Sequence, residues 1–474
     1  MTYDLIVVGT GFASSFFLHR YLQHRRPRHV LVLEAGPRVT HTEQLAAMDP
    51  TNRAVATAAY DQVAEQKKSW MFTLAFGGGS NCWWACTPRM LPEDFELHRR
   101  YGVGSDWPIS YDDLEPYYCD AEDILAVSGP SDDTPFRRSR RYPQPPHRFT
   151  HVDRALKAAH PESFFHQPTA RARLATERRP GCCANGVCTL CPIDAKFTIR
   201  KELPDLYARP EITVMTGARV QSVDVQGGVA KGVRWLSEGT EHHALGELVV
   251  LGANALFNAH ILLRSGIDHP ELGRGVVEQS SVTATVYLDG LDNFQGSTSL
   301  TGHGYTAYAG PHRAERAAAL VETSNVPLLR TEPGRWRQVA YIKFIYEDLR
   351  RPENRIELQD EHPDRPRLHW EARSDYAQRG LDAAPADLDN LCSSLPIERV
   401  AWSSPADTEA HILGSHVMGD DRASSVVDAE GRVHGVSNLV ALGGGSFPTA
   451  APANPTLTIC ALALRSADRL GGSA

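Results

Sequence analysis

A strand, a glycine turn, a helix and a second strand follow one another at the N-terminus, and this unit constrains the fold most strongly. Residues 3–8 form a short β-branched apolar run, which is typical of a strand buried on both faces. The turn Gly9-Thr-Gly11 comes next, then residues 12–23 with an apolar helical face, then the buried run 29–33. The order predicts a βαβ unit at the start of a doubly wound α/β sheet of the Rossmann type.

The same unit carries the pattern of a dinucleotide site. Gly9 and Gly11 permit a tight turn and the close approach of a pyrophosphate to the start of the helix. Ser14 occupies the third glycine position of the usual motif. Glu34 ends the second strand about 20 residues further on, where a carboxylate accepts hydrogen bonds from an adenosine ribose. The alternative is a tight turn that binds no ligand.

A second glycine-rich segment, residues 76–89, reads FGGGSNCWWACTPR. Consecutive glycines let the backbone approach a flat ring closely, so we expect this loop at a cofactor. A glycine loop packed beneath the tryptophan pair is the alternative interpretation.

Composition excludes several classes of protein. The chain has 474 residues, of which 42% are hydrophobic and 22% charged, as in ordinary globular proteins. With 49 basic and 57 acidic residues the formal charge is −8, which argues against a nucleic-acid partner. We find no apolar run of the ~18–20 residues that a membrane span needs. No signal peptide is recognisable before the first strand, so we expect a cytoplasmic protein.

Four sequence blocks in the same order resemble the glucose-methanol-choline (GMC) family of FAD-dependent oxidoreductases. They are VVGTGFASS with VLEAG, the loop FGGGSN, the stretch 102–129, and the C-terminal HILGSH and FPTAAPANPTLT. Within the family the blocks look most like pyranose 2-oxidase and bacterial iron–sulfur FAD-dependent sugar dehydrogenases. The resemblance implies a doubly wound FAD-binding domain, interrupted by a substrate domain with a mixed or antiparallel sheet.

We divide the chain accordingly. The FAD-binding domain is expected to comprise three segments, 1–104, 205–275 and 406–474, the last of which carries the catalytic residues. The substrate domain is expected to comprise 105–204, with four cysteines, and 276–405, with the sheet. Runs 281–288, 338–347, 354–358 and 366–371 are expected to form one mixed sheet. The segment 129–149 is rich in Pro, Ser, Asp and Arg and predicts an exposed loop.

The resemblance also implies the catalytic residues. Oxidation of an alcohol needs a base for the hydroxyl proton, and histidine titrates near neutrality. His411 in HILGS matches the catalytic histidine of the family pattern, with Ser415 in place of threonine. Asn454 matches the family partner, and an amide can orient the substrate oxygen but cannot be the base. His416 is a rival candidate for the base.

The expected cofactor is FAD, held without a covalent bond, because Cys82 occupies the family's position for a flavin-linking histidine. The candidate cofactor-binding residues lie in the N-terminal unit, the glycine loop, two later strand ends and the C-terminus. They are Gly9, Gly11, Phe12, Ala13, Ser14, Glu34, Ala35, Gly78, Gly79, Ser80, Asn81, Cys82, Val220, Ala253, Gly444, Gly445, Pro455 and Thr456.

Four closely spaced cysteines are candidates for a metal centre: Cys182, Cys183, Cys188 and Cys191. Thiolates in a short loop followed by proline fit an iron–sulfur cluster, either 3Fe-4S or 4Fe-4S. The segment also resembles the cluster-binding run of bacterial FAD-dependent glucose and fructose dehydrogenases, although it is one residue shorter between the last two cysteines. A zinc site, disulfides, or no metal at all are alternatives.

Together these features predict oxidation of a sugar, glycoside or polyol hydroxyl to a carbonyl. Electrons would then pass through the cluster to an acceptor protein or a quinone, as in a dehydrogenase. The alternatives are an oxidase that uses oxygen without a cluster, a lyase of the same family with structural FAD, and a non-catalytic electron-carrying subunit.

Overall fold

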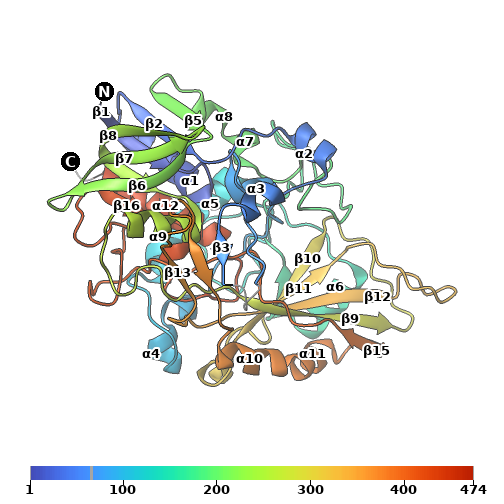
Figure 1. The fold of residues 1–474 in the computed structure, drawn as a ribbon. Coiled ribbons are helices and arrows are strands. Elements are labelled where there is room, and N and C mark those ends of the chain that lie inside the picture. The colour runs from blue at the N-terminus through green and yellow to red at the C-terminus, as the bar shows by residue number, and fades with distance from the viewer. Residues whose placement is uncertain (1, 64–67, 473–474) are drawn as a thin grey trace.

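The structure is a computed structural model that describes residues 2–63 and 68–472. A seven-stranded sheet forms one side of the molecule, and a six-stranded sheet projects from the other side (Figure 1). The strands of the first sheet run in the order β5-β2-β1-β8-β7-β6, with β16 beside the end of β8. Their bounds are β1 (Thr2–Val8), β2 (Val30–Glu34), β5 (Ile212–Thr216), β6 (Arg219–Gln226), β7 (Val229–Ser237), β8 (Thr240–Leu251) and β16 (Leu439–Ala441).

The first sheet is the expected doubly wound sheet. Strands β5, β2, β1, β8 and β16 are parallel, whereas β6 and β7 add an antiparallel hairpin. The βαβ prediction is confirmed, because α1 (Phe12–His24) connects β1 to β2. β2 and β16, the second half of β1 and the end of β8 are buried on both faces, which explains their continuous apolar runs, whereas β5 at the edge is only partly buried.

Helices cover this sheet. α1 packs against α12 (Thr456–Gly471), and α12 packs in turn against α5 (Tyr111–Leu125). α5 belongs to the stretch 105–204, which we assigned to the substrate domain. It nevertheless packs against α12, which covers the first sheet. α9 (Asn254–Arg264) follows the end of β8, as the apolar run after residue 251 indicates.

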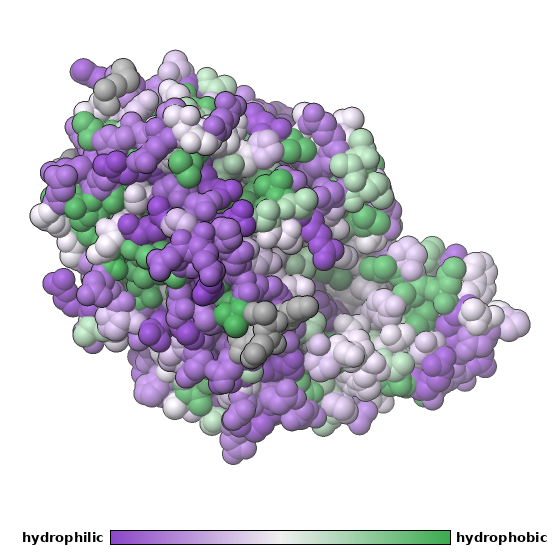
Figure 2. Space-filling model, viewed as in Figure 1, coloured by the Kyte–Doolittle hydropathy of each residue, from purple (hydrophilic) through white to green (hydrophobic). Residues whose placement is uncertain are grey.

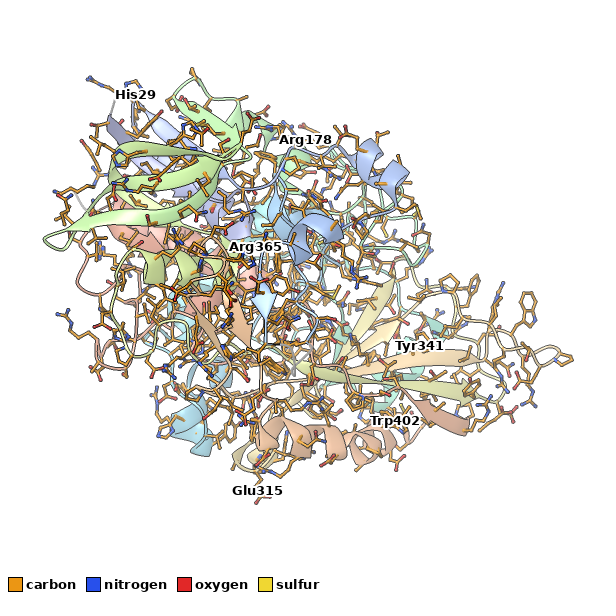
Figure 3. The ribbon with its side chains drawn as sticks, in the orientation of Figure 1. His29, Arg178, Glu315, Tyr341, Arg365 and Trp402 are labelled. Carbon is orange, nitrogen blue, oxygen red and sulfur yellow. The ribbon has the colours of Figure 1, made fainter. Side chains whose placement is uncertain are left out.

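The second sheet is antiparallel, in the order β15-β9-β12-β11-β10-β4. Its strands are β4 (Phe164–His166), β9 (Ser280–Leu288), β10 (Leu300–Gly304), β11 (Ala319–Ser324), β12 (Val339–Tyr346) and β15 (Ile397–Trp402). One face packs on α10 (Asp375–Asp382) and α11 (Ala384–Cys392), around a core of its own. In Figure 3, Tyr341 and Trp402 mark β12 and β15 of this projecting sheet. Figure 2 shows apolar residues gathered on this projection.

The expectation of a single substrate-domain sheet is wrong. Runs 281–288 and 338–347 form β9 and β12, but β13 (Arg355–Glu357) and β14 (Arg367–His369) lie in a separate sheet with β3 (Asp61–Gln62). Three-residue strands carry too little pattern to show their partners, and β3 is distant in sequence.

The segment 129–149 is irregular, as predicted, but it is not simply exposed. Phe136, Tyr142 and Phe149 are buried, and the Arg138 guanidinium lies 3.4 Å from the centre of the Tyr142 ring. The remaining helices are short: α2 (His41–Ala47), α3 (Arg53–Thr57), α4 (Leu97–Tyr101), α6 (His151–Ala159), α7 (Ile199–Glu202) and α8 (Pro204–Tyr207). Within residues 2–63 and 68–472, we find no helix long and apolar enough to span a bilayer.

Candidate active site

A cavity of about 570 Å³ runs between the carboxyl ends of the parallel strands and the second sheet. Ligands of doubly wound proteins bind at this edge of the sheet. One end is lined by the turn after β1 and by the end of β2. The other end is lined by Glu322 of β11, Lys343 of β12 and the segment 408–413.

The first end is shaped by glycine. A Cβ atom on Gly9 would lie 2.6 Å from the carbonyl oxygen of Gly252, and the φ angle of Gly9 is +88°. Only glycine therefore lets the ends of β1 and β8 approach this closely. Gly11 precedes α1 without any side-chain cap, so the first N–H groups of the helix remain available to an anion.

Glu34 is held in place at the same end. One of its oxygens accepts hydrogen bonds from the N–H (3.0 Å) and hydroxyl (2.6 Å) of Thr10, and the other accepts from Gly36 N–H (2.9 Å). Burial raises the pKa of this carboxyl, and the hydrogen bonds lower it in part. The side chain is thus fixed at the cavity wall, where it can accept from a ribose hydroxyl.

The glycine loop forms another wall. Gly78 and Gly79 line the cavity, together with Trp83 and Trp84. The Trp83 indole donates to the carbonyl of Phe197 (2.8 Å) and lies edge-on to Phe12, with ring centres 4.6 Å apart. The loop thus offers bare backbone beside rigid aromatic rings, as a flat cofactor requires.

His411 lies at the opposite end and is oriented by Gln279. The Gln279 amide nitrogen donates to the carbonyls of Ala451 (2.7 Å) and Ala453 (3.1 Å), so its oxygen faces His411 Nδ1 at 2.7 Å. An acceptor at that position requires Nδ1 to carry the hydrogen. His411 Nε2 therefore has a free lone pair and can accept a proton.

The backbone that carries His411 is fastened by a buried ion pair. Lys68 Nζ binds the carboxylate of Glu278 and the carbonyl of Asp407, and the Thr408 hydroxyl donates to Glu278 at 3.2 Å. Lys68 Nζ also lies 4.8 Å and 4.5 Å from the ring centres of two tryptophans, Trp70 and Trp370. These contacts hold segment 407–411 against the second sheet.

The electrostatic environment keeps His411 neutral. Burial lowers the pKa of His411 to about 4; the charge of Glu322 raises it and that of Lys343 lowers it, both to a smaller extent. The imidazole is therefore unprotonated at neutral pH, which is the form that a general base needs.

Asn454 lines the same cavity. It is 8% exposed, and its Oδ1 has no hydrogen-bond partner within the described residues. A buried acceptor without a partner is costly, and a ligand hydroxyl that entered the cavity would satisfy it. Gln279 connects the two residues, since it binds His411 on one side and the carbonyl that precedes Asn454 on the other.

Comparison with known families agrees with this geometry. The family model for GMC oxidoreductases matches residues 3–280, and the model for the C-terminal region of the family matches residues 350–463. The chain is a GMC oxidoreductase. GMC enzymes act on alcohols and use FAD, and the glycine cradle, the uncapped α1 and the buried Glu34 suit that cofactor.

Two similar proteins match nearly the whole chain, and a third matches about half of it. The fructose dehydrogenase large subunit of Gluconobacter japonicus is 25% identical, covering 98% of this chain and 97% of its own. Paromamine 6'-oxidase of Streptomyces fradiae is 29% identical, covering 99% and 91%. C-glycoside 3-oxidase of Arthrobacter globiformis is 28% identical over 55% of this chain and 53% of its own.

The fold has solved counterparts. An FAD-dependent oxidoreductase from Chaetomium thermophilum superposes with a TM-score of 0.70 at 14% identity, and 99% of each chain is covered. The arrangement of the two sheets in this GMC oxidoreductase is therefore that of the solved structure.

Most of the candidate cofactor residues line the cavity. They are Gly9, Gly11, Phe12, Ala13, Glu34, Ala35, Gly78, Gly79, Cys82, Val220, Ala253, Gly444, Pro455 and Thr456. Four candidates lie behind this wall. Ser14 donates to Val8, Ser80 to Gly77, and Asn81 to Phe76, while Gly445 packs on the His416 ring. These four shape the loops rather than face the cavity.

His416, the rival base, does not line the cavity. It is 0% exposed, its Nδ1 pairs with Ser415 Oγ at 3.0 Å, and burial lowers its pKa to about 3. A Cβ atom on Gly445 would lie 2.0 Å from the imidazole, so the glycine makes room for the ring. This packing indicates a structural role for His416.

The structure does not gather the four cysteines as metal ligands. Cys182 lies 3.5 Å from Thr298 Oγ1, Cys188 3.0 Å from Ser299 Oγ, Cys191 accepts from Ala195 N–H, and Cys183 is exposed. In the described stretches of the chain, no group of three or more histidine, cysteine or acidic side chains is arranged to hold a metal. The predicted cluster thus does not fit this arrangement, because no three of the sulfurs are grouped and three of them contact other polar atoms, and we derive no step through it.

Sequence reasoning missed three residues of the site: Gln279, Glu322 and Lys343. Each is a single residue at or beside a strand of the second sheet, and no motif surrounds it. The alternation within β11 and β12 places Glu322 and Lys343 on one face, but only strand pairing shows that this face meets His411.

Proposed function

We propose that the protein oxidises a hydroxyl group of a sugar or glycoside to a carbonyl, with His411 as the base. The observation that carries the proposal is the fixed tautomer of His411, whose Nε2 is free in the cavity that Asn454 also lines. The names of the relatives give fructose, C-glycosides and paromamine as their substrates, which supports a carbohydrate substrate here.

The chain's own groups divide the work. The Asn454 amide positions the substrate oxygen, and His411 Nε2 accepts the hydroxyl proton as the carbonyl forms. FAD, when bound, supplies the acceptor for the hydride that leaves the same carbon. Aromatic and apolar side chains around the cavity exclude water from the reacting groups.

Anaerobic mixing of the FAD-loaded protein with a panel of sugars and glycosides tests this function. We expect substrate-dependent bleaching of the flavin absorption and recovery of a keto or aldehydo sugar. A flavin that stays oxidised with every sugar would contradict the proposal, and carbonyl formation without bleaching would indicate a lyase.

The same assay identifies the electron acceptor, because the reduced flavin can be mixed with one candidate acceptor at a time. We propose an acceptor that reaches the flavin directly, because the cysteine thiols are not assembled into a relay. Recovery of oxidised flavin with oxygen would assign an oxidase, and recovery only with a quinone or an acceptor protein a dehydrogenase.

A further inference from the structure

Within the described residues, a buried carboxylate that no Lys or Arg pairs lies at the substrate end of the cavity. Glu322 projects from β11, lines the cavity beside His411 and Lys343, and is 6% exposed. Its charge acts on His411, which shows that the two side chains are near each other. No step of the proposed reaction uses this group.

The polar contacts of Glu322 involve only one of its two carboxylate oxygens. Its Oε1 lies 3.4 Å from Gln167 Nε2 and 3.5 Å from His303 Nε2, and within the described residues Oε2 has no hydrogen-bond partner. Because Glu322 lines the cavity, this oxygen is available to a hydrogen-bond donor of a bound ligand.

His303 and Gln167 are the polar neighbours of this carboxylate. The Gln167 amide oxygen accepts from Arg171 (2.6 Å), so its Nε2 must donate, and it lies 2.9 Å from His303 Nε2. The Gln167 amide thus supplies the hydrogen in its contact with His303 Nε2, and the contact of His303 with Glu322 at 3.5 Å is long. The remaining acceptors of Arg171 are Thr298 and two backbone carbonyls, and none of them is a carboxylate.

Lys343, the nearby cation of the cavity wall, is already paired. Its Nζ lies 2.5 Å from Glu409 Oε2, and Ser281 donates to the other oxygen of that carboxylate. Within the described residues, no Lys or Arg nitrogen lies within 4 Å of Glu322. Burial raises the pKa of Glu322, but its contact with His303 and the charge of Lys343 lower it further, so the substrate end of the cavity presents an ionised carboxylate.

We infer that the substrate is an amino sugar or aminated glycoside whose ammonium group binds Glu322. A hydroxyl group would donate a neutral hydrogen bond to the vacant oxygen, whereas an ammonium would make a charge-assisted hydrogen bond with the ionised carboxylate, which is roughly twice as strong. The inference rests on the proposed function and narrows its substrate class.

Matched sugars test the inference. We compare kcat/KM for glucose with that for its 2-, 3- and 6-amino-deoxy derivatives and for N-acetylglucosamine, which has no charge. At least one amino sugar should exceed glucose by about tenfold or more, the scale of one charged hydrogen bond. The acetylated sugar should lose the advantage of the 2-amino derivative.

Glu322→Gln tests whether Glu322 causes the preference for amino sugars. The amide has the same size as the carboxylate and keeps one acceptor oxygen, but it has no charge. The ratio of amino sugar to glucose should fall towards one, and Glu241→Gln, on distant β8, should keep the wild-type ratio. FAD content and melting temperature show whether both variants are folded.

The outcomes separate the two proposals. If glucose and every amino sugar react equally well, or if Glu322→Gln retains the ratio, the inference is overturned and the proposed function stands. If no sugar bleaches the flavin, the proposed function fails and the inference fails with it.

Discussion

At the residue scale, the proposed reaction requires a neutral His411, whose Nδ1–H is held by Gln279. The family pattern identified His411 and Asn454 from the sequence, because both stand in C-terminal motifs. Gln279 could not be predicted in this way, since it lies 132 residues before His411 and has no distinctive neighbours. Only the approach of the second sheet to the C-terminal segment gives it a role.

The low pKa of His411 predicts an acid limb in catalysis. The rate constant for flavin reduction should be constant above about pH 5 and fall as His411 takes up a proton near pH 4. Glu322→Gln removes the negative charge that raises this pKa and should move the limb to lower pH. Lys343→Met removes a positive charge and should move it to higher pH. Stopped-flow reduction across pH checks all three, and identical limbs would contradict this assignment.

Gln279 should act as a positioning residue. Gln279→Leu removes the acceptor of His411 Nδ1–H, and we expect flavin reduction to slow by about tenfold or more, as for the loss of one buried hydrogen bond. Gln279→Glu places a carboxylate beside the imidazole and should raise the pKa of His411. An upward shift of the acid limb in this variant distinguishes positioning from a general loss of structure, and an unmoved limb would refute it.

At the scale of elements, the βαβ unit was predictable because β1, the glycine turn, α1 and β2 each carry a strong local pattern. The pairing of β13 and β14 was not predictable, since the pattern of a three-residue strand does not show which strand lies beside it. The loop 129–149 was predicted as exposed from its polar composition, but its aromatic residues anchor it. The cysteine loop shows the same limit, because spacing alone does not say which way each sulfur points.

The turn after β1 provides a prediction at this scale. Gly9→Ala should lower FAD content and the melting temperature, because a Cβ there meets the Gly252 carbonyl and the φ angle is left-handed. Gly239→Ala is the matched control: its φ is +77°, and nothing lies within 4 Å of the added atom. Equal FAD content in the two variants would contradict the role given to close packing.

At the scale of the whole molecule, a buried network joins three distant segments. Arg313 binds Asp94 at 2.9 Å and Glu347, which follows β12, at 2.6 Å, and all three side chains are buried. Burial raises the pKa of Asp94 to about 6, and the Arg313 charge opposes this shift. The network holds the segment around residue 94 against the second sheet.

Loss of the central cation should therefore destabilise the protein. Arg313→Met leaves two buried carboxylates without their cation, which costs about 3–5 kcal/mol in comparable cases. Arg141→Met, which breaks an exposed pair with Asp132, should leave the melting temperature unchanged within error. Thermal melts of the FAD-loaded proteins check this, and similar midpoints for the two variants would show that the network is dispensable.

The most direct test of the central claim is single-turnover flavin reduction in His411→Gln and His416→Gln, measured with a sugar that bleaches the wild-type flavin. We expect that His411→Gln keeps its FAD but that its flavin is reduced about 10²–10⁴-fold more slowly, the usual contribution of a general base. His416→Gln, whose side chain lies outside the cavity, should be reduced at close to the wild-type rate. Near-normal reduction in His411→Gln, with a large loss in His416→Gln, would contradict the account.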